Sequence, residues 1–286
     1  MTSSTTIGQW AINMSPERKA FRSGSKLEQL ANQCAGYFPK ENSLVQKEFG
    51  VPSLIVRFDC TVSDRGIYVY EFEDRPRGVG IACCYVPGFH ERLSELSSMW
   101  PTFGYLDSGA RKAGDDCLWL EAYNATKHQG VLVRGEPHEF PELEPMSIST
   151  TRFEGNKEYG IDMGWWRKGS SEADIDWGQD FVIKPLVGCM SRGILVWTPT
   201  LGRAPGTSTK TKITNAIRNM FDGFYIQPFH PPMDFGGGYR GIFRLFLGFS
   251  PLAQGYKYLG GLWMSRPNGQ LIIHGTSESM TGIVEF

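Results

Sequence analysis

The sequence predicts a mixed α+β (α/β) protein built around a central antiparallel β-sheet. Residues 51–60 and 66–72 are rich in Val, Ile and Tyr, and Ser63-Asp64-Arg65-Gly66 between them is typical of a turn, so a β-hairpin is expected. Strand-like runs that follow one another predict an antiparallel meander over 224–229, 239–248, 256–264 and 271–273. Apolar residues at helical spacing predict helices within 25–34, 90–99 and 208–220.

Composition narrows the class of protein. The 286 residues are 41% apolar, which is enough for a substantial core. The net charge of -1 argues against a general nucleic-acid or membrane-surface binder. The six cysteines have no Cys-x-x-Cys spacing, which disfavours zinc and a disulfide framework and favours a reducing, cytoplasmic setting. No apolar run approaches the length of a membrane span or a signal peptide, so neither is expected.

The predicted hairpin carries an unusual set of charges. Residues two apart on a strand share a face, so Arg57 and Asp59 lie together, as do Glu71 and Glu73 on the partner strand. If those two faces coincide, three carboxylates converge, and a hard cation such as Mg²⁺ or Ca²⁺ would relieve their repulsion. The alternative is a solvated hairpin face on which arginines pair with the acids at the surface.

A second candidate site lies in the second half of the chain. Residues 180–185 predict a strand that ends in Lys184 and Pro185, 188–193 form a glycine-bounded loop, and 194–197 predict the returning strand. Exposed backbone N–H groups beside a lysine could cradle phosphate oxygens. An ordinary hairpin turn next to a surface lysine is the alternative.

Taken in order, these motifs resemble a known family. The pattern Arg57-x-Asp59, twelve residues on to Glu71 and two more to Glu73, followed by the Lys184-Pro185 strand, resembles the synthetase domain of glutathionylspermidine synthases. The resemblance covers roughly residues 50–280 and is weak over 85–150. It implies the circularly permuted ATP-grasp fold, with a smaller α+β lid. It also implies an ATP- and Mg²⁺-dependent carboxylate–amine ligase that forms an amide through an acyl phosphate.

The resemblance also implies roles for individual residues. The metal ligands would be Asp59, Glu71 and Glu73, and the catalytic arginines Arg57 and Arg266. The nucleotide would be bound by Lys157, Lys184, Gly188, Arg192 and Gln227. The substrates would be a small-molecule or peptide carboxylate and an amine, and the oligomeric state stays open. Arg240 and Arg244 either bind a substrate carboxylate or pair with acids.

Departures from the family pattern keep other functions open. Glu73 stands where the family has Asn, the 189–192 loop is altered, and a thiol-amidase domain is lacking. A catalytically impaired ATP-binding regulatory or interaction protein of the same fold is therefore an alternative, and a β-rich domain that binds no nucleotide is a third. Within a single catalytic unit, we expect an N-terminal helix and metal hairpin (1–84), a substrate subdomain (85–150), a nucleotide lid (151–223) and core strands (224–286).

Overall fold

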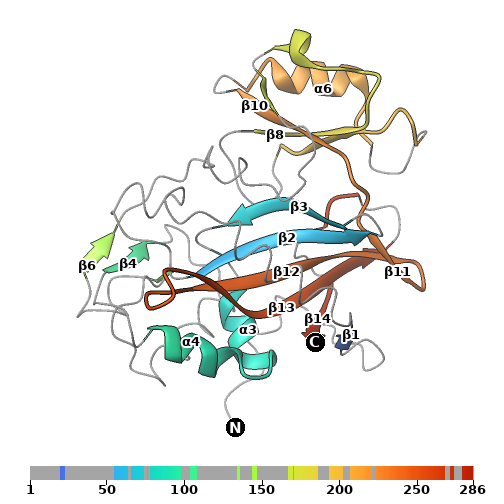
Figure 1. The fold of residues 1–286 in the computed structure, drawn as a ribbon. Coiled ribbons are helices and arrows are strands. Elements are labelled where there is room, and N and C mark those ends of the chain that lie inside the picture. Colours follow the sequence, from blue (N-terminus) through green and yellow to red (C-terminus); the bar gives the residue numbers. More distant parts are fainter. Residues whose placement is uncertain are drawn as a thin grey trace.

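The computed structural model shows two mainly antiparallel sheets. It describes residues 20–22, 55–63, 66–73, 76, 78–97, 104–107, 134–135, 144–146, 167–169, 171–185, 193–201, 207–220, 223–267, 271–273 and 279–285. Figure 1 shows the larger sheet at the centre, with helices below it and the smaller sheet, which has its own helix, above it.

The larger sheet has seven strands. Its order is β1 (Ala20–Arg22), β14 (Met280–Glu285), β13 (Gly255–Pro267), β12 (Tyr239–Ser250), β2 (Ile55–Ser63) and β3 (Gly66–Glu73), and β11 (Met233–Gly236) also pairs with β12. All neighbours are antiparallel except β1 and β14. The predicted hairpin is therefore confirmed as β2 and β3, which form one edge of this sheet.

One face of the larger sheet packs on two helices and forms the main core. Helix α3 (Val79–Tyr85) and helix α4 (Phe89–Ser97) cover side chains that include Phe58 and Phe246. Leu93 and Leu96 are buried in this core, as the helical spacing predicts. The opposite face of this sheet borders the candidate functional site.

The smaller sheet is a separate layer with its own core. Its order is β7 (Arg167–Gly169), β10 (Phe224–Pro228), β8 (Phe181–Pro185) and β9 (Leu195–Trp197), with every pair antiparallel. Helix α6 (Lys210–Ile217) covers it with Ile213 and Ile217, and the short 3₁₀ helix η6 (Glu172–Asp174) precedes β8. The predicted strand that ends in Lys184 and Pro185, the returning strand within 194–197 and the helix within 208–220 are thus confirmed.

A third, small sheet is described by its backbone. Strand β4 (Gly104–Asp107) pairs in parallel with β5 (Arg134–Gly135) and with β6 (Glu144–Met146). Among the described helices, none has both the length and the apolar composition that a membrane crossing requires.

The predicted meander is wrong at both ends. Its first run is β10, which pairs with β7 and β8 in the smaller sheet. Residues 271–273 are not a strand, and β14 takes the place beside β13. An apolar run predicts that a strand forms, but its partners depend on long-range contacts. The predicted helix at 25–34 lies outside the described residues, and the subdomain boundaries stay predictions.

Candidate functional site

A pocket of about 90 Å³ lies between the larger and the smaller sheet. This volume is several times what a single water needs, roughly 10–15 Å³ on the same kind of measure. Its walls come from the hairpin, from β8 to β10 and the segment that follows β10, and from Ile242 and residues 271–273. The lining residues are Asp59, Tyr68, Val69, Tyr70, Glu71, Val182, Lys184, Ile194, Val196, Gln227, Pro228, Phe229, His230, Pro232, Ile242, Leu271, Ile272 and Ile273.

The hairpin register brings the predicted acidic positions onto one face. Asp59 pairs with Glu71, and Arg57 pairs with Glu73, directly across β2 and β3. The side chains of Asp59 and Glu71 both line the pocket, whereas that of Glu73 is outside the described part of the structure. Arg57 is only 2% exposed and Asp59 7%, so the alternative of a solvated hairpin face is wrong for these two residues.

Two guanidinium groups hold the Asp59 carboxylate. Arg57 donates from Nε to Oδ1 at 2.6 Å and from Nη2 to Oδ2 at 3.1 Å. Arg244, which lies opposite Asp59 on β12, approaches Oδ2 with its Nε at 3.4 Å. Of the two roles left open for Arg244, pairing with an acid is therefore the one observed. Buried charges require such pairing, because an unpaired carboxylate would lose its hydration without compensation.

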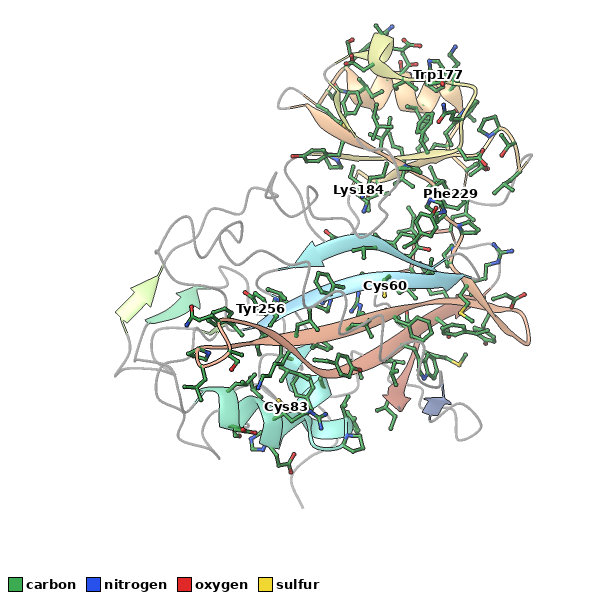
Figure 2. The ribbon with its side chains drawn as sticks, in the orientation of Figure 1. Cys60, Cys83, Trp177, Lys184, Phe229 and Tyr256 are labelled. Carbon is green, nitrogen blue, oxygen red and sulfur yellow. The ribbon has the colours of Figure 1, made fainter. Side chains whose placement is uncertain are left out.

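The smaller sheet contributes two predicted residues to the same pocket. Lys184 on β8 and Gln227 on β10 are each 5% exposed and line the pocket. Gln227 pairs with Val182, two residues from Lys184, so all three share the face of the sheet that looks toward the hairpin. Nζ of Lys184 donates a hydrogen bond to the backbone oxygen of Tyr70. Figure 2 shows that the Lys184 side chain points toward β3. The surface-lysine alternative is therefore wrong.

The two predicted catalytic arginines lie beside the pocket but are not among its lining residues. Arg57 is engaged with Asp59, which does line it. Arg266 is buried on β13 and donates from Nη1 to the backbone oxygen of Ile272 at 3.4 Å. Arg240 lies opposite both Arg266 and Asp234 in the sheet register. Lys157, Gly188 and Arg192 fall outside the described residues, and their roles stay predictions.

The motifs in the sequence do not point to an aromatic group that lines the pocket, formed by Tyr68, Tyr70 and His230. The Tyr70 hydroxyl donates to the backbone oxygen of His230 at 3.0 Å, and the rings of Tyr68 and His230 stack. Burial raises the pKa of the Tyr70 hydroxyl far above its usual range. Tyr68 and Tyr70 are visible in the sequence as strand residues, but their contact with His230 joins positions about 160 residues apart, for which the sequence has no local signal.

The donor chemistry at the hairpin fits Mg²⁺ bound together with phosphate. Mg²⁺ usually takes one or two carboxylates and completes its shell with water and phosphate oxygens. Asp59 and Glu71 provide two carboxylates at paired positions, and a carboxylate has about four acceptor sites, more than the guanidinium contacts of Asp59 use. Within the described residues, no cluster of three or more His, Cys, Asp or Glu side chains forms a cage for a metal.

The pocket lining combines apolar and charged side chains. Apolar side chains such as Ile194, Val196 and Ile273 line it together with a buried amide, Gln227. A lysine and two carboxylates also line it. Such a pocket suits a ligand with an apolar part and an anionic part, and buried polar groups would fix its orientation.

Comparisons with known proteins relate the chain to others through its fold. No family model matches the sequence, and no curated protein matches it either. Among solved structures, a similar one comes from Methylobacillus flagellatus KT and is provisionally assigned as a gamma-glutamylcysteine synthetase. The match has a TM-score of 0.50 and 7% sequence identity, and it covers 91% of this chain and 85% of that one. At this identity the match shows likeness of fold: the chain shares its overall architecture with that structure.

Proposed function

We propose that this protein is an ATP-dependent carboxylate–amine ligase of the ATP-grasp type. The observation that carries the proposal is the convergence of Asp59 and Glu71 from the hairpin with Lys184 and Gln227 from the smaller sheet in one pocket. The sequence motifs predict metal binding for the two carboxylates and nucleotide binding for Lys184 and Gln227. The likeness of fold to a structure provisionally assigned as a synthetase supports the same class.

The mechanism assigns positioning and charge stabilisation to the chain's own residues. Lys184 would bind phosphate oxygens as a point charge, and Gln227 would hydrogen-bond the base against the apolar wall. Asp59 and Glu71 would hold Mg²⁺, which would neutralise the negative charge of the phosphate groups. Arg57 and Arg266, which lie beside the pocket, would stabilise the negative charge that develops on the transferring phosphoryl group and the acyl phosphate.

The finer assignment, a glutathionylspermidine-synthase-like activity, is proposed from the order of the sequence motifs. It predicts that a small-molecule or peptide carboxylate is first phosphorylated and that an amine then displaces phosphate to form an amide. Residues 85–150, which we propose as the substrate subdomain, would select the two substrates.

The test is calorimetric titration with a non-hydrolysable ATP analogue, with and without Mg²⁺. Loss of a buried charged contact predicts at least about tenfold weaker binding for Lys184→Ala, because hydrogen bonds to charged groups contribute about 1.5–3 kcal/mol. Lys212→Ala removes an exposed lysine of α6 and serves as the matched control, with binding unchanged. Lack of Mg²⁺-dependent binding by the unsubstituted protein would overturn the proposal.

The guanidinium contacts of Asp59 favour a second candidate function. A carboxylate already held by Arg57 and Arg244 has less charge to offer a cation, which suits a protein that binds ATP but has lost ligation. The two functions separate in a screen for phosphate release with mixtures of carboxylates and amines. Release that requires both substrates supports the ligase, whereas Mg²⁺-ATP binding without release under any mixture supports the regulatory protein.

A further inference from the structure

We propose that Tyr70 is a positioning residue that holds Lys184 and the smaller sheet in place across the pocket. Its consequence for nucleotide affinity rests on the function proposed above, but its structural part does not. The sequence motifs assign no functional role to Tyr70. The inference follows from its place in the strand, from its two hydrogen bonds and from its packing.

Tyr70 is the extra residue of a β-bulge. Asp59 pairs with Glu71, but the next residue of β2, Cys60, pairs with Val69, so Tyr70 has no counterpart on β2. Bulges redirect side chains and are frequent beside functional sites. Here the bulge leaves Val69 in the main core and Glu71 at the pocket, while Tyr70 packs against Ile242, Met264 and Ile273 on the pocket side of the sheet.

Tyr70 bonds to two separate parts of the pocket wall. Its backbone oxygen accepts a hydrogen bond from Nζ of Lys184, which is on β8. Its hydroxyl donates at 3.0 Å to the backbone oxygen of His230, in the segment between β10 and β11 that leads from the smaller to the larger sheet. Tyr68, two residues away, stacks on the His230 ring and reinforces the second contact.

This arrangement fixes the ammonium group relative to the hairpin carboxylates. A lysine side chain is flexible, and holding it in one position costs conformational entropy. A ring that packs against the Ile242, Met264 and Ile273 cluster and is hydrogen-bonded through its hydroxyl keeps the bulge, and with it the acceptor for Lys184, in one geometry. A ligand that replaces Tyr70 as the acceptor for Lys184 then binds in a pocket whose walls are already ordered, which lowers the free-energy cost of binding.

The direct test needs no ligand. Acetylation by a limiting amount of acetic anhydride, read by mass spectrometry, measures the accessibility of Lys184, and the exposed Lys212 is the internal standard. We expect Tyr70→Phe, which removes the bond to His230, to raise the labelling of Lys184 relative to Lys212 several-fold. Tyr256→Phe is the matched control: it is also a buried tyrosine, and Figure 2 places it far from Lys184. Equal Lys184 labelling in Tyr70→Phe and the unsubstituted protein would overturn the inference, as would an equal rise in Tyr256→Phe.

A second measurement follows the consequence for binding. Titration with the Mg²⁺–ATP analogue should show about fivefold weaker binding for Tyr70→Phe, the change that loss of one hydrogen bond of about 1 kcal/mol gives. Tyr256→Phe should bind as the unsubstituted protein does, even if its melting temperature falls. Unchanged affinity in Tyr70→Phe would contradict a positioning role. If the unsubstituted protein binds no nucleotide, the proposed function fails while the labelling experiment still decides the role of Tyr70.

Discussion

Several charged residues at the site are buried, so the ion pairs that they form determine their roles in stability and binding. Arg57 and Asp59 are nearly inaccessible to solvent and neutralise one another, with Arg244 as a second cation. Removing Asp59 would take from both guanidinium groups the carboxylate that neutralises them, which costs more than the pair contributes. The Asp59 contacts therefore have a structural role as well as the proposed role in binding.

Tyr70 also makes stability depend on pH, in a direction that its burial determines. Burial raises the pKa of the hydroxyl in the folded state, whereas the unfolded chain has the usual value of about 10. Below that value both states hold the proton, and above it only the folded state does. Stability is thus lost as pH rises above about 10, by about 1.4 kcal/mol per pH unit.

We expect Tyr70→Phe to remove this dependence. Its free energy of unfolding, measured by urea denaturation from pH 9 to 11, should fall less steeply above pH 10 than that of the unsubstituted protein. Other titrating groups contribute to both proteins and cancel in the difference. Parallel curves for the two proteins would mean that the hydroxyl is not buried as described.

At the scale of elements, close packing between neighbouring strands constrains the larger sheet. A methyl group added at Gly282 of β14 would lie 2.4 Å from two carbon atoms of the Trp263 indole on β13. Trp263 is 2% exposed and belongs to the main core, so its ring has little room to move. Glycine is therefore required at this position by the side chain of the adjacent strand.

Gly282→Ala should destabilise the protein by about 1–3 kcal/mol, the usual cost of overpacking a core. Gly255→Ala, at the beginning of β13, is the matched control, because its added methyl would meet only the Ala253 backbone oxygen at 3.8 Å. Urea denaturation of both variants measures the difference. A similar stability for the two would show that Trp263 repacks at little cost.

At the scale of the whole molecule, the pocket joins two sheets that have separate cores. The described contacts across it include the bonds of Tyr70 to Lys184 and to the backbone at His230. A ligand that contacts both walls adds to these connections. Binding should therefore stabilise both sheets together, rather than one of them alone.

Hydrogen exchange with the Mg²⁺–ATP analogue measures this coupling. At a concentration of a hundred times its dissociation constant, the ligand stabilises the folded state by about 2.7 kcal/mol. We expect slower exchange in β2 and β3 and also in β8 and β10, with β14 changed least. Protection confined to one sheet would contradict a site between them.

Local signals in the sequence are enough to predict individual strands and helices and part of the charged site. Val- and Ile-rich segments around a turn define the hairpin, helical spacing buries Leu93, Leu96, Ile213 and Ile217, and the period of two places Arg57 and Asp59 on one face. These signals are local and follow from backbone geometry. Long-range contacts determine that β10 joins the smaller sheet, that Arg244 pairs with Asp59, and that the Tyr70 bulge reaches Lys184 and His230. The side-chain contacts join residues more than a hundred positions apart, and β10 could have paired with either sheet. Long-range packing, rather than a local preference of the chain, therefore determines them.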